Sequence, residues 1–328
     1  MKRALGAAVT LLLVASVVFV IFFVIPHGGG TRPRGGVSSV ALLMGGRQAP
    51  ISELRRIDHN LGLDRPVWVQ YGMYMDRLAH FDLGHDYYAG APVWSVLKPA
   101  IPPTLSIAVG ASMVWVVGGI VFGVFAAKRR GSFADKAAMG AAVAALSIPI
   151  FVVALIGIHL VYRWFNVYAG KRYVPITESP LAWLQSMWLP WLVLAFPLIA
   201  IYARMVRSNL VEAKDQEYMR TAVAKGLKDR QITRHELRGG LTPIVTMYGL
   251  DFGLLLGGSM IIEKIFDIPG LGLLLLNSRS FYDFPVMSGI VIIAALAVIV
   301  MNLVVDIAYG ALDPRVRIAG PTPALRGT

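Results

Sequence analysis

Six long apolar segments follow one another along the chain, separated by segments rich in charged residues, glycine and proline. A transmembrane helix needs about 20 largely apolar residues to cross the hydrocarbon core of a bilayer. The six segments reach or approach that length, so the pattern predicts an all-α polytopic membrane protein with six transmembrane helices. The predicted spans are residues 4–25, 103–127, 137–162, 188–206, 242–262 and 285–311.

The first apolar segment begins after Lys2 and Arg3, as a secretory signal peptide would. Its apolar run, from Val9 to Ile25, is longer than the core of a signal peptide, and no A-x-A cleavage site follows it. We therefore expect residues 1–25 to be retained as the first transmembrane helix.

The distribution of Lys and Arg predicts the orientation, because these residues collect in cytoplasmic loops, whereas long loops cross regardless of their charge. If both termini are cytoplasmic, the inside segments hold 18 Lys and Arg and the two short outside loops hold 5. The inside segments are 1–3, 128–136, 204–241 and 312–328, the short outside loops are 163–187 and 263–284, and the long outside loop is 26–102.

The composition agrees with a membrane protein and excludes several other classes. Hydrophobic residues make up 56% of the chain and charged residues 15%, against about 25% charged in an average soluble domain. The chain has no cysteine, which excludes disulfides, zinc–thiolate sites, iron–sulfur clusters and a cysteine nucleophile. The net charge of +12 is explained by basic cytoplasmic loops and needs no nucleic acid partner.

The segment 26–102 is predicted to be an extracytoplasmic loop with short helices at 51–61 and 67–78. We expect it to form a small cap or docking surface. Within it, His80 and His85 lie near two aspartates, but without the tight spacing of metal ligands. We interpret this part as a solvated loop and predict no metal site.

The inside segment 204–241 is rich in charges of both signs and contains an amphipathic pattern that ends near Gly226, a residue suited to a left-handed helix C-cap. A half-apolar helix exposed on the cytoplasmic side needs a surface that covers it. From composition alone, that surface is either the lipid bilayer or a groove on another protein. The apolar positions of the pattern are Tyr218, Met219, Ala222, Val223 and Leu227.

The stretch 217–227 (EYMRTAVAKGL), with Pro243 seventeen residues after Gly226, resembles the cytoplasmic signature loop of binding-protein-dependent ABC importer permeases. The Arg-Thr-Ala form is similar to the dipeptide/oligopeptide (peptide/nickel) subfamily. Further stretches match the family in order, over about residues 1–318. They are 61–66 (LGLDRP) with Gln70 and Tyr71, 81–84 (FDLG), 103–105 (PTL), 129–132 (RRGS) with Asp135, 147–149 (SIP), 256–259 (LGGS) with Glu263 and Phe266, 269–272 (PGLG), 282–285 (YDFP), 302–303 (NL) with Asp306, and 312–317 (LDPRVR).

Two positions depart from the family pattern. The Pro-Gly-Asp-Pro that follows the first span in the family is replaced by 26–30 (PHGGG), and Asp251 stands where an uncharged or amide residue is expected. Both positions lie on or near the transport path that the resemblance implies.

The resemblance implies the fold of a type I ABC importer transmembrane domain, here residues 103–318, and a complex in the cytoplasmic (inner) membrane of a prokaryote. The implied partners are ATP-binding subunits, a second homologous permease and an extracytoplasmic substrate-binding protein. A coupling helix near 214–228 would contact the ATPase. The implied coupling residues are Glu217, Tyr218, Arg220, Thr221, Ala222, Lys225, Gly226 and Leu227.

The chain itself lacks the motifs of an ATPase or a protease. A phosphate-binding loop ends in Gly-Lys-Ser/Thr, whereas the only Gly-Lys pair, at Gly170, is followed by Arg172. A zinc-protease motif begins at His235, but Gly239 stands where its second histidine is required. We therefore predict that this chain is no enzyme, and that ATP and magnesium are bound by the partner subunits.

Asp251 lies near the middle of a predicted span, where an aspartate costs roughly 2.5–3.5 kcal/mol on insertion scales and should face a cavity or a partner. Gly249, Gly253 and Gly257 form a close-packing stripe, and Asp251 points about 200° away from it. We therefore hypothesise that Asp251 lines the translocation path and favours a cationic or amine-bearing substrate; the alternative is an internal salt bridge or a protonated, hydrogen-bonded aspartate. Ser259 and Glu263 complete the candidate path residues.

Three further points remain open at this stage. Gly119 and Gly123 form another close-packing pair, which fits a contact between permeases or packing within the subunit. A di- or oligopeptide is the expected cargo, with a nickel chelate, glutathione or a glycoside as alternatives, and a standalone channel or secondary transporter is the alternative class. The tail, residues 319–328, is predicted to be disordered.

Overall fold

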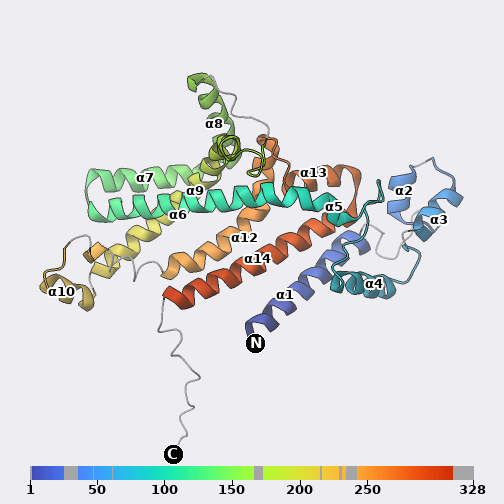
Figure 1. Ribbon diagram of the computed structural model, residues 1–328, viewed down its shortest axis with the longest axis horizontal. Helices are drawn as coiled ribbons and strands as arrows, with labels where there is room; N and C mark the ends of the chain where they lie inside the picture. The colour runs from blue at the N-terminus through green and yellow to red at the C-terminus, as the bar shows by residue number, and fades with distance from the viewer. Residues whose placement is uncertain are drawn as a thin grey trace, which may run out of the picture. The chain divides into compact units, whose positions relative to one another are not determined.

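The computed structural model describes residues 2–25, 36–46, 48–60, 62–165, 173–214, 216–228, 231–233 and 242–312 (Figure 1). The regular structure of this part of the chain is helical, as predicted; the predicted tail lies outside it. The helices are α1 (Lys2–Phe19), continued by a π-helical turn (Val20–Val24), α2 (Ser39–Gly45), α3 (Ile51–Asn60), α4 (Val67–Ala79), α5 (Val93–Leu97), a 3₁₀ turn (Lys98–Ala100), α6 (Ile101–Lys128), α7 (Phe133–Ser147), α8 (Ile150–Phe165), α9 (Pro180–Lys214), α10 (Glu217–Ala224), α12 (Thr242–Ile265), α13 (Leu271–Phe281) and α14 (Phe284–Leu312).

Several helices in the described residues are long and apolar enough to cross a membrane. By length and composition there are four, or five if the bent pair α7 and α8 is counted as one span. The predicted span 242–262 coincides with the continuous helix α12, which does not belong to the four candidate spans. The four segments are Leu5–Val24, Val93–Lys128, Pro180–Lys214 and Phe284–Val305.

The predicted span 137–162 is divided into α7 and α8, which meet at an angle of 104°. Ile148 at the junction has an extended backbone, with φ −91° and ψ 122°, and Pro149 follows it. Proline disfavours a helical conformation in the residue before it and cannot donate to the helix ladder. The apolar pattern continues through the junction, so it predicted the span but not the bend.

Helix α9 has 35 residues and continues through Pro190 and Pro197. At 1.5 Å per residue it is about 50 Å long, whereas the hydrocarbon core of a bilayer is about 30 Å thick. A helix of this length extends well past the hydrocarbon core, and its last residues lead directly to α10.

The chain divides into two compact units, and the division falls within α6 and α14. Unit 1 comprises residues 1–104 and 269–299. In it, α1 packs on α4 through the rings of Phe19, Phe23 and Tyr74, whose centroids are 5.4–5.7 Å apart. The backbone N–H of Leu271, at the start of α13, donates to the buried Thr104 Oγ1 at 2.8 Å.

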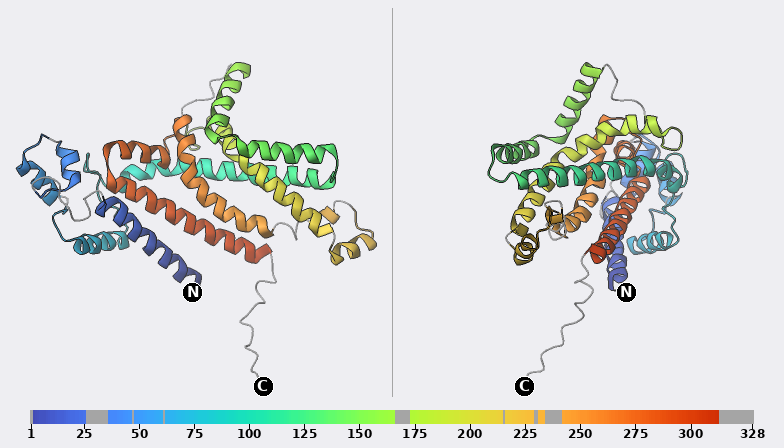
Figure 2. Two further views of the ribbon diagram at one scale, coloured as in Figure 1. Left: turned by 180° about the vertical axis from the view of Figure 1, so that it is seen from behind. Right: turned by 60° about the vertical axis from the view of Figure 1, so that its left-hand side comes forward.

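Unit 2 comprises residues 105–268 and 300–328, and its core is built on the seam between α6 and α9 (Figure 2). A Cβ atom added at Gly119 would lie 2.4 Å from the Tyr202 Cβ, and one added at Gly123 would lie 2.5 Å from the Val206 Cβ. These two glycines therefore serve close packing within the subunit, which decides between the two alternatives left open by the sequence.

Candidate functional site

The predicted amphipathic helix in the second inside segment is present as α10, two residues after α9 ends. The Thr221 Oγ1 donates to the Glu217 carbonyl at 3.2 Å, and the N–H of Lys225 donates to the Thr221 carbonyl at 3.0 Å. Gly226 has φ +70°, the left-handed conformation that glycine adopts without steric cost after a helix. The predicted end of the helix is confirmed.

One face of α10 is buried against its own chain and another is exposed. The Met219 side chain is 2% exposed, so one of the five apolar positions of the pattern is covered by this chain itself. Of the predicted coupling residues, Glu217, Thr221, Lys225 and Gly226 are exposed and Leu227 is half-buried. The side chains of Tyr218, Arg220 and Ala222 lie outside the described part of the structure.

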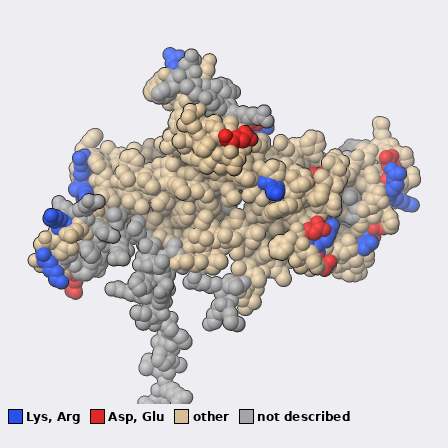
Figure 3. Space-filling view, in the orientation of Figure 1, with Lys and Arg blue, Asp and Glu red and all other residues tan. Residues whose placement is uncertain are grey.

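Basic residues gather at the end of unit 2 that carries α10 and the turn between α6 and α7 (Figure 3). The Arg129 guanidinium stacks on the Phe125 ring at 4.3 Å from its centroid. The exposed basic residues of this end are Lys128, Arg129, Arg130, Lys136, Lys214, Lys225 and Lys228.

An ion pair joins the start of α7 to α9 at this same end. The Arg207 Nε and Nη2 donate to the two oxygens of Asp135 at 2.5 and 2.7 Å. The Asp135 side chain is 3% exposed and that of Arg207 is 26% exposed. Planar, bidentate pairs of this kind are among the strongest charge-assisted contacts. Arg207 lies seven residues before the end of α9 at Lys214.

Asp251 in α12 accepts a hydrogen bond at 2.8 Å from the hydroxyl of Tyr202 on α9. Tyr202 is fully buried, whereas Asp251 is half-buried. On another face of α12, a Cβ atom added at Gly249 would lie 3.0 Å from the Asn302 Oδ1 on α14. Asp251 therefore points away from Gly249, as predicted, and its carboxylate has a neutral hydroxyl partner.

The remaining candidate path residues, Ser259 and Glu263, are both 0% exposed in this chain. The Ser259 Oγ donates to the Glu263 Oε1 at 3.3 Å, across one turn of α12. Their role in a path stays a prediction, since neither side chain reaches the surface of unit 2.

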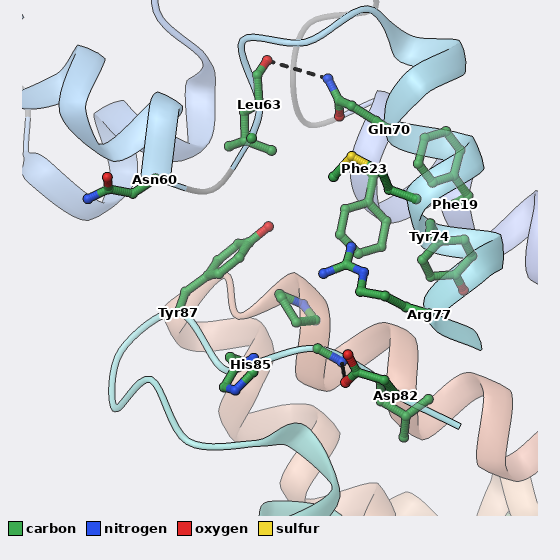
Figure 4. A pocket seen from close by; sticks show the side chains of 15 residues that line it. Phe19, Phe23, Asn60, Leu63, Gln70, Tyr74, Arg77, Asp82, His85 and Tyr87 are labelled. Carbon is green, nitrogen blue, oxygen red and sulfur yellow. Dashed lines mark hydrogen bonds between the residues drawn. The ribbon is translucent and has the colours of Figure 1, made fainter. Parts of the chain in front are cut away.

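Unit 1 contains a cavity of about 190 Å³. Arg77 projects into it from α4 and Tyr87 from the loop before α5 (Figure 4). Tyr74 also lines it, and its buried hydroxyl has no hydrogen-bond partner among the described residues. Burial raises the pKa of Tyr74 to about 12, and the nearby Arg77 charge opposes that rise. At neutral pH the phenols of the cavity are therefore neutral, and Arg77, Asp82 and His85 are the other titratable side chains of its lining.

The sequence analysis did not identify Tyr202 or Arg207 as functional residues. These two residues of α9 are the partners of Asp251 and Asp135. Asp135 was noted only as part of a family motif. Arg207 could have been found as a basic residue near the end of an apolar run, but no local pattern links it to a residue 72 positions away. In the described part of the chain, no group of three or more His, Cys, Asp or Glu side chains is arranged to hold a metal ion.

Several helices long and apolar enough to cross a membrane, two of them packed along a glycine seam, are those of a multi-pass membrane protein. The family described as "Binding-protein-dependent transport system inner membrane component" matches residues 119–318, and its N-terminal counterpart matches residues 1–108. The chain belongs to this family, and its function is that of the membrane permease of a binding-protein-dependent transport system.

Named relatives cover almost the whole chain. A putative peptide transport system permease protein of Brucella abortus (strain 2308) is 36% identical over 97% of this chain and 98% of the relative. The glutathione transport system permease protein GsiC of Salmonella typhimurium (strain LT2) is 35% identical, with 97% and 98% covered. A solved structure of the MetNI methionine ABC transporter, in an inward-facing conformation, is similar in fold with a TM-score of 0.53. It is 18% identical, over 66% of this chain and 96% of that chain.

Proposed function

We propose that this permease forms half of the translocation pathway of an ATP-driven importer for di- or oligopeptides. The observation that carries the proposal is α10, a short helix with an exposed face at the basic end of unit 2. The relative from Brucella abortus, named as a peptide transport permease, supports the cargo. ATP and magnesium would be bound by ATPase subunits, so this chain contributes motion and a pathway but no catalysis.

The proposed topology has six spans with both termini in the cytoplasm, in the inner membrane of a prokaryote. Contacts within each unit support the predicted sides of the loops. In unit 2 the predicted inside segments 128–136 and 204–241 are joined by the Asp135–Arg207 pair. In unit 1 the predicted outside segments 26–102 and 263–284 are joined by a hydrogen bond from the Tyr88 hydroxyl to the Phe281 carbonyl.

The proposed mechanism is rigid-body transmission. Closure of two ATPase subunits would displace α10, which is attached to α9 by two residues. Because α9 is packed against α6 along the glycine seam, a displacement of its end would carry unit 2 with it. Switching transitions of this kind proceed by helix and domain shifts rather than by continuous deformation. A second permease would supply the other half of the path, and a substrate-binding protein would deliver the cargo outside.

The coupling role of α10 is tested by reversing its charge. The chain would be co-expressed with its chromosomal neighbours and purified by a tag. We expect ATP-binding subunits and a second permease to co-purify with the native chain. The double variant Arg220→Glu and Lys225→Glu should lose the ATPase subunits and keep the second permease. The two substitutions reverse the charge of α10, so an attraction between opposite charges at the interface becomes a repulsion between like charges.

The matched control is the double variant Arg55→Glu and Arg56→Glu, which makes the same charge change on α3 in the predicted extracytoplasmic loop. It should retain the ATPase subunits. ATPase subunits that stay bound to the α10 variant would move the docking surface elsewhere in 204–241, and a chain that purifies only with itself would contradict the importer.

Asp251 is proposed to line the path and to favour substrates that carry an amine. The Asp251→Asn variant keeps the acceptor oxygen for the Tyr202 hydroxyl but removes the negative charge. We expect peptide uptake to weaken, with KM rising more than kcat falls, because the charge acts on binding of the amine. Uptake that matches the native chain at every pH would end this assignment and leave Asp251 as a hydrogen-bonded structural residue.

Glutathione is the second candidate cargo, favoured by the relative named as a glutathione transport permease. Competition between unlabelled and labelled substrates distinguishes the two candidate cargoes. With the complex in proteoliposomes and its own binding protein supplied, uptake of a labelled dipeptide should be inhibited by excess unlabelled oligopeptide and unaffected by glutathione. The reverse result would assign glutathione.

A further inference from the structure

The contact between Asp135 and Arg207 has a geometry that a chance surface ion pair lacks. Asp135 uses both oxygens for Arg207 and also accepts the Gly131 N–H at 3.0 Å. Its own N–H donates at 3.2 Å to the hydroxyl of Ser132, the N-cap residue of α7. A carboxylate that is 3% exposed and has these partners fixes the position of both elements that it joins.

The elements joined are the tight turn between α6 and α7 and the last third of α9. Gly131 in the turn has φ +80°, a backbone conformation that favours glycine and gives the turn its sharp change of direction. Arg207 precedes the end of α9 by two turns of helix, about 10 Å at 1.5 Å per residue. No other ion pair between α9 and another helix occurs in the described residues.

We propose that Asp135 and Arg207 are positioning residues for energy coupling, which hold the end of α9 against the α6–α7 turn so that motion of α10 is passed to α6 and α7. The inference rests on the proposed coupling role of α10. Without the pair, apolar packing alone holds the end of α9 against α6 and α7, and the same displacement of α10 moves the path less.

The first test measures transport per ATP hydrolysed, at equal amounts of assembled complex in proteoliposomes. The variants are Asp135→Asn, Arg207→Gln and Arg207→Lys; the control is Arg204→Gln, an exposed arginine one turn earlier on α9. We expect the ratio to fall by about 2- to 30-fold in Asp135→Asn and Arg207→Gln. Arg207→Lys should lie between them and the native chain, because lysine keeps the charge but loses the fork, and Arg204→Gln should match the native chain.

The second test needs no cargo. Since the native chain has no cysteine, cysteines placed at the exposed positions Lys136 and Lys225 can carry two spin labels without background labelling. The distance distribution between the labels should be narrow in the native complex, broader in Asp135→Asn, and unchanged in Arg204→Gln.

The outcomes distinguish failure of the positioning role of Asp135 and Arg207 from failure of the coupling role of α10. A purely structural role would lower the yield of complex and leave the transport ratio and the label distances unchanged, which would overturn the proposal. If the α10 charge reversal leaves ATPase binding and transport intact, the coupling role of α10 fails. If that variant loses both while Asp135→Asn keeps the native ratio, only the positioning role fails.

Discussion

A single methyl group at Gly123 is expected to destabilise the α6–α9 seam, although glycine is itself a poor helix former. The added Cβ would lie 2.5 Å from the Val206 Cβ and 2.7 Å from the carbonyl oxygen of Ala203. The second contact is with backbone, which cannot turn away as a side chain can. Overpacking of this kind costs typically about 1–3 kcal/mol, and we expect Gly123→Val to cost more and to prevent recovery of folded protein.

The matched control is Gly140→Ala on α7, because nothing lies within 4 Å of a Cβ atom added there. In that open position the change gains up to about 1 kcal/mol of helix propensity. The two glycine-to-alanine variants should therefore shift the thermal inactivation temperature in detergent in opposite directions. A Gly123→Ala variant at least as stable as the native chain would show that α6 and α9 do not approach as closely as described.

The second large effect is expected at Asp58, a 3% exposed carboxylate on α3. It accepts the N–H of Ser38 at 2.8 Å and also the Ser38 hydroxyl, and that hydroxyl caps α2 by accepting the Ala41 N–H at 3.1 Å. Asp58→Ala leaves these buried groups without an acceptor, at a cost of about 1–3 kcal/mol for each. We expect α2 and α3 to separate.

Limited proteolysis of the complex measures this separation, as faster cleavage between residues 36 and 60 in Asp58→Ala. The control is Asp64→Ala, which removes a carboxylate from the same region. Asp64 pairs with His59 at 2.9 Å, but the two side chains are 40% and 81% exposed, and exposed pairs contribute about 0–1 kcal/mol. Equal cleavage rates in the two variants would contradict the role assigned to Asp58.

Local pattern was sufficient to predict most helices. The short helices expected at 51–61 and 67–78 are α3 (Ile51–Asn60) and α4 (Val67–Ala79). The end of α10 just before Gly226 could also be predicted, since glycine readily adopts the left-handed conformation that follows a helix. These features depend on side-chain periodicity and on backbone preferences of single residues, which the sequence displays directly.

Features that depend on distant residues could not be predicted. The partner of Asp251 is Tyr202, 49 positions away, and the partner of Asp135 is Arg207, 72 positions away. The glycine pair in α6 predicted a close contact but did not say with which helix. The direction of α8 after Pro149 goes with contacts to α9 and α12, which lie far along the chain, so the apolar pattern alone predicted only that a span is present.

Pro197 gives the end of α9 that leads to α10 a mechanical property of its own. Pro197 cannot donate to the carbonyl of Val193, so the helix bends more easily there than elsewhere along its length. From Pro197 to Lys214 the rod measures about 25 Å. A pivot of about 5° at the proline would sweep the tip through about 2 Å, the size of the helix shifts that switch known allosteric interfaces. α9 thus acts as a lever that pivots at Pro197, so that a small rotation at the proline becomes a shift of about 2 Å at the end that leads to α10.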